Sequence, residues 1–395
     1  MTPSRVLVVG ASAAGLATAE ALRRKGYDGT LTLLGGEPHL PYDRPPLSKQ
    51  VLAGAKEPGT TRLRTPEALA ALDAELLLGD PAVGLDAAGR TVRTASGREL
   101  GADAVVVATG LRARTLPGLT GPQGVHVLRT LDDALALRTD LLAARRLVVV
   151  GEGVLGCEIA ATARSLGLDV TLAGPRPGPM LAQFGPVVSD LLGALHTGQG
   201  VRLRLGRAVT GLTTEQDRVT GVRLETDEVL PADVVAVAVG GEPATDWLAG
   251  SGLRIGDGLV CDSRCRAADG IYAVGDVAAW HHELLGATVR LENRTNATEQ
   301  ALAVAGNILG ADLPYVPVPY FWTDQFDARI QAHGLLAPDA RVTVVDGSPE
   351  TGRFVARYER DGRVTGVLGW SMPKQARLRR QEIGGPVPSL EPSTP

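Results

Sequence analysis

The stretch Arg5–Glu37, RVLVVGASAAGLATAEALRRKGYDGTLTLLGGE, determines how the rest of the chain is interpreted. Residues 5–9 form an apolar, β-branched run that is long enough for one buried strand. Residues 16–24 are rich in Ala and Leu and have helical character, and residues 31–34 form a second apolar run. The stretch therefore predicts a βαβ unit.

A glycine-rich turn, Gly10-Ala11-Ser12-Ala13-Ala14-Gly15, separates the first predicted strand from the helix. Gly10 permits a tight turn and Gly15 lets the helix pack closely on the strand, whereas Ser12 replaces the middle glycine of the usual pattern. The helix N-terminus would offer free N–H groups to a pyrophosphate. Glu37 follows the glycine turn by roughly 20 residues, at the end of the second predicted strand. An acid at this position can reach the hydroxyls of an adenosine ribose. The pattern favours a dinucleotide site over the alternative, a glycine turn in an ordinary βαβ unit.

A second glycine-rich turn, Gly151-Glu152-Gly153-Val154-Leu155-Gly156, is a complete G-x-G-x-x-G. A predicted strand, 147–150, precedes it, and a predicted helix, 157–166, and strand, 170–173, follow. Two such units with the correct flanking elements predict two dinucleotide sites in one chain.

The second unit has no acid at the end of its second strand, which continues into Gly174-Pro175-Arg176. Without a carboxylate there, nothing repels a 2′-phosphate, and Arg176 could pair with one. This mildly favours NADPH over NADH. The alternative is that Arg176 faces solvent and NADH binds less tightly.

Composition places the chain among soluble globular proteins of two or three domains, with 395 residues, 44% hydrophobic and 21% charged. The net charge of −4 gives no reason to expect binding to nucleic acid or to an anionic membrane. Cys157, Cys261 and Cys265 are too few for a disulfide framework and lack the spacing of a metal site. We expect reduced thiols, no metal and a cytoplasmic location.

Several loops follow predicted strands in a way that suits a bound cofactor. The proline-rich residues 38–49 predict an extended loop in which Ser48 could cap a following helix, with Arg44 and Lys49 as cations for a phosphate or an electron-rich ring. Residues 76–100 predict a small antiparallel excursion. The apolar runs 104–108, 234–239 and 271–274 predict strands that end at Thr109-Gly110, Gly240-Gly241 and Gly275-Asp276.

The pattern changes near residue 314, where prolines lead into Tyr320-Phe321-Trp322 and then into probable strands at 341–346, 353–359 and 363–369. We therefore predict an α/β protein with two Rossmann-like (three-layer ββα/α) nucleotide-binding domains and a C-terminal α+β domain. The expected boundaries are 1–112 with 237–313 for a discontinuous FAD-binding domain, 113–236 for an NAD(P)H-binding domain, and 314–395 for the C-terminal domain.

Six motifs together carry a family resemblance: the first glycine turn with Glu37, PYDRPPLSK (41–49), Ala108-Thr109-Gly110, the second glycine turn with Glu158, AVGD (273–276) and FWTDQ (321–325). With these motifs in this order, the chain resembles the FAD-dependent NAD(P)H:ferredoxin reductases of the glutathione-reductase structural class. Those enzymes serve bacterial cytochrome P450 and Rieske oxygenase systems. The proline-rich motif is the most specific of the six.

The resemblance implies a role for each matching residue. It implies FAD contacts from Gly10, Ser12, Ala14, Gly15, Glu37, Arg44, Lys49, Ala108, Thr109, Gly110, Gly275 and Asp276. The turn at Gly240 and Gly241 is predicted as a further close approach of the backbone to a cofactor. It implies nicotinamide-nucleotide contacts from Gly151, Gly153, Leu155, Gly156, Glu158 and Arg176. It implies an approach to the flavin ring by Glu292, Asn296, Gln300 and Trp322. Lys49, Glu158 and Trp322 are the residues to which it gives a part in catalysis.

The activity that the resemblance implies is transfer of electrons from NAD(P)H through FAD to a small [2Fe–2S] ferredoxin, by a monomer or homodimer. Ferredoxins are usually acidic, so we expect a basic patch; the candidates are Arg290, Arg294, Arg329, Lys374, Arg377, Arg379 and Arg380. A disulfide reductase is excluded because residues 38–60 contain no cysteine. An FAD-bound NADH sensor or structural protein stays open as an alternative, as does a rubredoxin or small-molecule acceptor.

Overall fold

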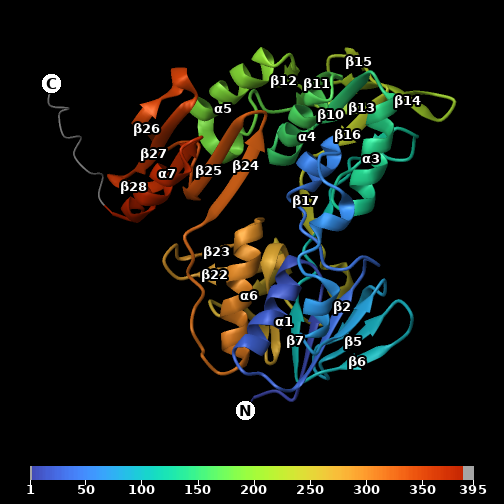
Figure 1. Ribbon diagram of the computed structural model, residues 1–395, viewed down its shortest axis with the longest axis vertical. Coiled ribbons are helices and arrows are strands. Elements are labelled where there is room, and N and C mark those ends of the chain that lie inside the picture. Colours follow the sequence, from blue (N-terminus) through green and yellow to red (C-terminus); the bar gives the residue numbers. More distant parts are fainter. Residues whose placement is uncertain (1, 386–395) are drawn as a thin grey trace. The chain divides into compact units, whose positions relative to one another are not determined.

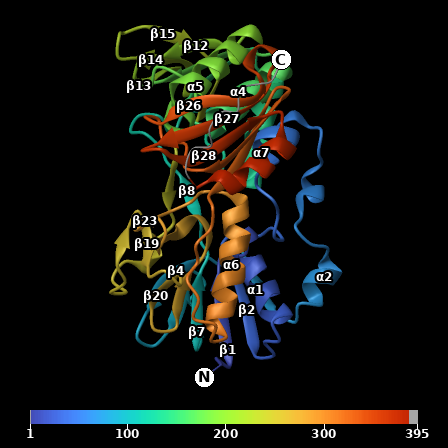
Figure 2. The same cartoon turned by 90° about the vertical axis from the view of Figure 1, so that its left-hand side faces the viewer.

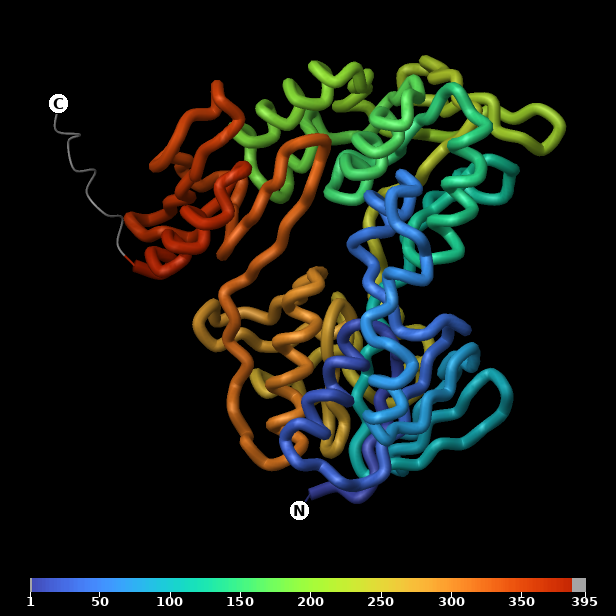
Figure 3. Tube along the Cα trace, viewed as in Figure 1, coloured from blue at the N-terminus to red at the C-terminus, as the bar shows by residue number. Residues whose placement is uncertain are grey.

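The computed structural model describes residues 2–385, and the chain divides into two compact units (Figures 1 and 3). Unit 1 comprises Met1–Pro45, Glu57–Arg112 and Gly241–Pro317, and unit 2 comprises Pro46–Lys56, Ala113–Gly240 and Val318–Pro395. Residues 46–56, which we assigned to the first domain, therefore cluster with unit 2. The division of the chain into three domains stays a prediction, and residues 386–395 of the third lie outside the described residues.

Unit 1 is built on a sheet of order β20-β21-β7-β1-β2-β3. β20 is antiparallel to β21, and the remaining strands are parallel. The helices α1 and α6, far apart in the sequence, lie side by side against it (Figure 2). Their bounds are β1 (Arg5–Val9), α1 (Ala13–Arg24), β2 (Thr30–Gly35), β3 (Glu75–Leu78), β7 (Ala104–Val107), β20 (Arg266–Ala268), β21 (Ile271–Ala273) and α6 (Arg294–Ile308).

The smaller elements of unit 1 are an antiparallel sheet, a mixed sheet with one parallel pair of strands, and short helical elements. Their bounds are β4 (Ala82–Asp86), β5 (Thr91–Thr94), β6 (Glu99–Gly101), β18 (Ile255–Gly256), β19 (Gly258–Cys261), β22 (Ala278–His282), β23 (Ala287–Val289), β17 (Gly241–Pro243), α2 (Pro66–Ala70) and the 3₁₀ turns Pro58–Thr61, Asp246–Leu248 and Gly275–Val277. The predicted excursion over 76–100 was wrong at its start: residues 76–78 pair in parallel with β2 and extend the main sheet.

Unit 2 contains a second parallel sheet, of order β12-β11-β10-β16-β9. Its elements are β9 (Val125–His126), α3 (Leu131–Ala143), β10 (Arg146–Val150), α4 (Val154–Ser165), β11 (Asp169–Gly174), α5 (Leu181–Gly198), β12 (Arg202–Leu205) and β16 (Val234–Val237). A small antiparallel sheet adds β13 (Val209–Glu215), β14 (Arg218–Leu224) and β15 (Val229–Pro231). β8 (Leu111–Ala113) pairs with β17.

The two parallel sheets repeat one pattern of side-chain support. In unit 1, Asp103 accepts hydrogen bonds from the backbone N–H groups of Ser4 and Arg5, each at 2.9 Å, and so fixes the start of β1. In unit 2, Asp233 accepts from the N–H groups of Arg145 and Arg146 at 3.1 and 2.9 Å, at the start of β10. Each aspartate immediately precedes the strand that neighbours the one it anchors, so the predicted repeat extends beyond the glycine turns.

Unit 2 also contains the C-terminal sheet, of order β24-β25-β28-β27-β26. It is antiparallel, and α7 (Pro373–Arg379) packs against it. The three predicted strands are confirmed as β26 (Arg341–Ser348), β27 (Arg353–Arg360) and β28 (Arg363–Trp370), whereas β24 (Tyr320–Gln325) and β25 (Ala328–Gly334) were not predicted. The Tyr358 hydroxyl donates to the Phe184 carbonyl at 2.7 Å and ties this sheet to α5.

Buried apolar runs account for the stability of both parallel sheets. β1, β2 and β7 are nearly continuous apolar segments, as is typical of strands covered on both faces.

Within residues 2–385, no helix is long and apolar enough to cross a membrane, and no cluster of three or more His, Cys, Asp or Glu side chains could hold a metal.

Replacing Leu33 in β2 should test the core of unit 1. Its side chain is fully buried, so Leu33→Ala should lower the free energy of unfolding by about 2–5 kcal/mol. Leu284 in the same unit is 83% exposed and serves as the control. Leu284→Ala should change the free energy of unfolding by less than about 0.5 kcal/mol. Urea denaturation measures both, and equal effects would contradict the assigned core.

Candidate functional site

The two glycine turns have the same backbone geometry in the two units. Gly10 has φ +121° and Gly151 has φ +118°. A Cβ on Gly10 would overlap the Ala108 carbonyl oxygen, and one on Gly151 would overlap that of Ala238. Both residues therefore have to be glycine, because any side chain would strain the backbone and push the neighbouring strand away.

The last glycine of each turn sets how closely helix and strand pack. A Cβ on Gly15 would overlap the Gly10 carbonyl oxygen and lie 3.2 Å from Cγ1 of Val8. A Cβ on Gly156 would overlap the Gly151 carbonyl oxygen. This is the close helix–strand contact that the third glycine of a dinucleotide-binding turn provides.

The helices that follow these turns begin without a side-chain cap. Ser12 precedes α1 and Gly153 precedes α4, and neither end has a side-chain hydrogen bond to its first N–H groups. By contrast, Thr130 caps α3 and Asn293 caps α6. Nothing lies within 4 Å of a Cβ built on Gly153. Free N–H groups at a helix start with open space before them suit a pyrophosphate, so both turns fit the dinucleotides predicted for them.

Glu37, predicted for the FAD ribose, follows β2 and is held in place by the proline-rich loop. Its carboxylate accepts from the Tyr42 hydroxyl at 2.5 Å and from Nη2 of Arg44 at 2.6 Å. The Arg44 guanidinium also lies over the Tyr42 ring, 5.2 Å from its centre. Arg44 is thus brought to Glu37 rather than to a free phosphate, and it orients the carboxylate.

Glu158 on α4 is the centre of a nearly buried polar cluster in unit 2. Its side chain is 6% exposed and pairs with Nζ of Lys49, itself 13% exposed, at 2.8 Å. Ser48 donates to the same carboxylate at 2.5 Å and Thr323 of β24 donates at 2.8 Å. Three segments distant in the sequence therefore converge on one carboxylate.

The expected capping role of Ser48 was wrong. Ser48 lies inside the single helical turn Leu47–Val51, and its hydroxyl is used on Glu158. Thr162 of α4 donates to the Ser48 carbonyl at 2.7 Å and fixes the turn on that helix. The proline-rich motif therefore serves to deliver Ser48 and Lys49 to Glu158.

Thr323 and Gln325, to which the sequence gave no individual role, extend the cluster. The Gln325 amide donates to Oγ1 of Thr323 at 3.2 Å, and its carbonyl oxygen lies 2.8 Å from Nε2 of His196. Burial lowers the pKa of His196, against the smaller opposing effect of this hydrogen bond. The signal that could have found them is their spacing, because residues two apart in FWTDQ share one face of a strand.

Trp322 lies beside Thr323 on β24 and is half-buried. Its ring stacks on Tyr320, with centroids 6.1 Å apart, and Tyr320 in turn stacks on His333 at 4.7 Å. Phe321 points to the other side and stacks on Phe184 at 5.5 Å. Because side chains alternate along a strand, Trp322 and Thr323 face opposite ways, so Trp322 lies on the face of β24 opposite to the one that contacts Glu158.

The remaining predicted FAD residues of unit 1 lie at the ends of strands and at the start of α6. Gly275 donates its N–H to the Gln300 side chain at 2.7 Å, which fixes the turn that carries Asp276. Asn296 is buried and accepts from the Tyr315 hydroxyl at 3.0 Å. Thr109 donates to the Ala244 carbonyl at 2.8 Å. Ala14 and Ala108 are buried, Gly110 has positive φ, and Gly241 opens β17.

In unit 2 the remaining predicted nucleotide residues are more open. Leu155 is half-buried on the first turn of α4, and Arg176 is exposed just beyond β11. Gly240 has φ +104° and no atom within 4 Å of a built Cβ. These positions stay predictions.

Most of the proposed basic patch is neutralised within the chain. Arg290 pairs with Asp257 and with Glu292, the latter at 2.7 Å; Arg294 pairs with Asp43, Arg329 with Asp324, and Arg379 with Asp346 and Glu382. Lys374, Arg377 and Arg380 are exposed on α7 and the turn after it, and no ion pair to them is found among the described residues.

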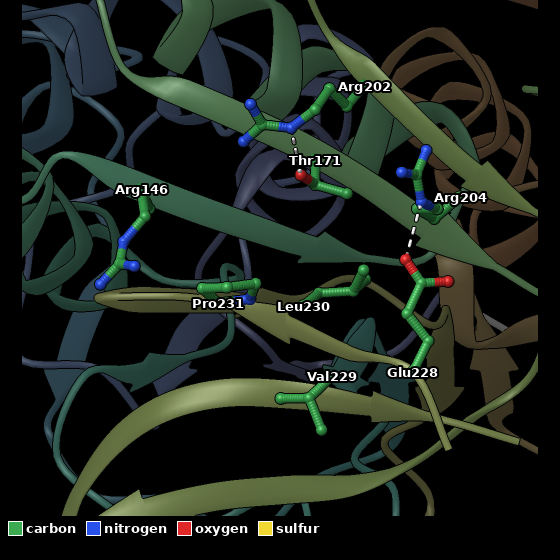
Figure 4. Close-up of a pocket in the computed structure, with 8 residues that line it drawn as sticks. All are labelled: Arg146, Thr171, Arg202, Arg204, Glu228, Val229, Leu230 and Pro231. Carbon is green, nitrogen blue, oxygen red and sulfur yellow. Dashed lines mark hydrogen bonds and ion pairs between the residues drawn. The ribbon is translucent and has the colours of Figure 1, made fainter. Parts of the chain in front are cut away.

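A pocket of about 260 Å³ lies on the sheet of unit 2 (Figure 4). Its arginines are engaged: Arg146 with Asp233, Arg204 with Glu228 at 3.1 Å, and Arg202 with Thr171 at 3.3 Å. Arg146 and Arg202 are the first residues of β10 and β12. Nucleotides bind at the carboxyl ends of parallel strands, so this pocket is not the candidate nucleotide site.

The three cysteines are free and buried. Burial raises the pKa of the Cys157 thiol and that of Cys265, the latter to about 12. A protonated, buried thiol is a poor nucleophile, so none of the three is suited to thiol–disulfide chemistry.

Two like strand–turn–helix units with open helix starts define a protein of the double dinucleotide-binding class. The chain belongs to the pyridine nucleotide-disulphide oxidoreductase family, which matches residues 4–301, and residues 320–388 match the reductase C-terminal family. This confirms the predicted family resemblance and the α/β fold class. FAD and NAD(P)H are the cofactors that the family implies.

Named relatives cover nearly the whole chain. Rhodocoxin reductase of Rhodococcus erythropolis is 34% identical over 386 residues, 97% of this chain and 90% of that protein. The ferredoxin–NAD(+) reductase subunit of the benzene 1,2-dioxygenase system of Pseudomonas putida is 36% identical over 387 residues, 97% and 93% of the two chains. The solved structure of the covalent putidaredoxin reductase–putidaredoxin complex has a TM-score of 0.91 at 35% identity and covers 96% and 92%.

Removing the Glu158 carboxylate should expose the cost of a nearly buried, unpaired ammonium. Glu158→Ala should lower the free energy of unfolding by about 3 kcal/mol, because Lys49 would lose its counter-charge. The double variant Lys49→Met/Glu158→Gln should recover much of that loss, since neither charge remains. Urea unfolding measures both, and a Glu158→Ala protein as stable as the unchanged one would contradict the buried pair.

Proposed function

We propose that the protein is an FAD-dependent NAD(P)H:ferredoxin reductase whose acceptor is a small [2Fe–2S] ferredoxin serving a P450 or Rieske-type oxygenase. The observation that carries the proposal is the Lys49–Glu158 pair, held by a C-terminal strand and by the proline-rich motif. The named relatives support it, because they match this chain over nearly their whole length. Their names describe reductases of rhodocoxin, of putidaredoxin and of a dioxygenase ferredoxin.

The chain would hold FAD in unit 1. The first glycine turn and the uncapped start of α1 would bind the pyrophosphate, and Glu37 would bind the adenosine ribose through its free lone pairs. Asp276 would accept from the sugar-alcohol hydroxyls. FAD, when bound, supplies the exchange between a two-electron donor and a one-electron acceptor.

Lys49 is the residue that would tune the redox centre. Its side chain is nearly buried, and the Glu158 carboxylate fixes the position of its ammonium. A fixed cation in a low-dielectric site stabilises negative charge that develops close to it. Glu158 positions Lys49 and also lies on α4, the helix whose start would bind the nicotinamide nucleotide.

A sensor or structural protein is the rival of another class. It would bind both cofactors but would not pass electrons on. The neutralised arginines leave Lys374, Arg377 and Arg380 as the basic groups that could meet an acidic ferredoxin.

We place the protein in the cytoplasm because its buried cysteines are unpaired.

The nucleotide preference inferred from the sequence depended on the missing acid at Gly174. The side chain of Glu152 nevertheless lies against Gly174, so a carboxylate is present beside the strand end. The preference for NADPH stays a prediction, and the proposed electron donor is NAD(P)H.

The function is tested by electron transfer to cytochrome c with and without a [2Fe–2S] ferredoxin. A reductase should bind FAD, and added ferredoxin should raise cytochrome c reduction by at least about tenfold, because the small carrier reaches both redox partners. Turnover that no ferredoxin stimulates, with nucleotide bound to FAD-loaded protein, would contradict the proposal and favour the sensor.

Lys49→Met should separate cofactor binding from electron transfer. We expect the variant to retain FAD but to be reduced by the nucleotide at least about tenfold more slowly in stopped-flow measurements, because the cation is lost. Lys56→Met, in the same segment and without an ion pair in the described residues, is the matched control and should react normally. Equal rates in all three proteins would remove Lys49 from the redox centre.

A further inference from the structure

We propose that Glu152, inside the second glycine turn, supplies the carboxylate that binds the adenosine ribose of the nicotinamide nucleotide and makes NADH the preferred donor. The inference rests on the proposed function, since it concerns the nucleotide site of that enzyme. It reverses the preference that the strand end at Gly174 predicts from the sequence.

Glu152 is an acid with no structural partner. The residue is only 6% exposed, and within residues 2–385 no hydrogen bond or ion pair to its carboxylate is found. Its oxygens are not among the buried polar atoms that lack a partner, so the carboxylate reaches solvent while the rest of the side chain is covered. A carboxylate that opens to solvent from an otherwise buried side chain, with no partner among the described residues, is available to a ligand.

The carboxylate lies beside the strand end from which the acid of a dinucleotide site usually projects. A Cβ built on Gly174, the last residue of β11, would overlap Oε2 of Glu152 and lie 2.8 Å from its Cδ. In the usual arrangement an acid at this strand end reaches the ribose hydroxyls from its own Cβ. Here the acid comes from the neighbouring turn, and Gly174 leaves the space for it.

The backbone around Glu152 is fixed, and its side chain lies against Gly174. Gly151 donates its N–H to the Ala173 carbonyl at 2.8 Å, and Met180 donates to the Glu152 carbonyl at 2.8 Å. α4 begins directly after the turn, and its start is uncapped. The acid and the phosphate-binding helix start therefore belong to one rigid unit.

Two arginines beyond the strand end carry the opposite argument. Arg176 and Arg207 are exposed, and the Arg207 N–H donates to the Gly174 carbonyl at 3.2 Å. Either could pair with a 2′-phosphate. Both are solvated side chains, whereas most of the Glu152 side chain is buried, so the repulsion between its carboxylate and a phosphate is screened less. The buried acid should dominate.

Glu152→Gln tests the inference by removing the charge while keeping the shape. The readouts are the dissociation constants of ADP-ribose and 2′-phospho-ADP-ribose by calorimetry on FAD-loaded protein, and kcat/KM for NADH and NADPH. We expect the unchanged protein to prefer the nucleotides without the 2′-phosphate. The variant should shift both preferences towards the phosphate by at least about tenfold, about 1.4 kcal/mol.

Asp190→Asn, an exposed acid on α5, is the matched control and should leave both ratios unchanged. A preference of the unchanged protein for the 2′-phosphate, or ratios that Glu152→Gln does not move, would overturn the inference, and an altered melting temperature alone would not rescue it. Failure of both nucleotides to bind or to reduce the protein would instead contradict the proposed function.

The double variant Glu152→Gly/Gly174→Glu moves the acid to the strand end. It should restore the preference for NADH and ADP-ribose, because the carboxylate again reaches the ribose. Gly174→Glu alone should perturb the turn, since its side chain would overlap Glu152. If Glu152→Gln does not fold, the single variant Glu152→Gly decides: a shift of both preferences towards the 2′-phosphate supports the inference, and unchanged preferences overturn it.

Discussion

The contact between the last glycine of each turn and the carbonyl of the first is the constraint on which this structure depends. A single added carbon at Gly15 or Gly156 would collide with that carbonyl. The contact draws each helix onto its strand and leaves the first N–H groups of the helix uncovered. Both predicted dinucleotide sites, and the parallel sheets that carry them, follow from this one approach of backbone to backbone.

The Glu158 carboxylate joins elements that the parallel sheet alone would not organise. A helix of the second glycine unit, the proline-rich segment and a strand of the C-terminal sheet all supply groups to it. A buried charge pair contributes little net stability compared with apolar packing, so its presence indicates a functional requirement. Under the proposed function, that requirement would be a fixed cation at the redox centre.

Much of the fold could be predicted because its parallel strands are uninterrupted apolar runs. β1, β10 and the three last strands begin within one residue of where the sequence indicated. β24 escaped prediction because Thr323 and Gln325 are polar yet buried, and α5 because Gly185 and Pro186 interrupt it. The role of Glu152 could not be predicted, since its meeting with Gly174 depends on packing between a turn and a strand end.

The central claim is that one chain holds two adenine dinucleotides at once, in two copies of one structural unit. The most direct test is the binding stoichiometry of the purified protein, measured by flavin absorbance and by calorimetry with NAD⁺. The account predicts one FAD per chain and one further nucleotide site that stays available when FAD is bound. A protein that binds no FAD when incubated with an excess, or in which NAD⁺ displaces FAD, would contradict it.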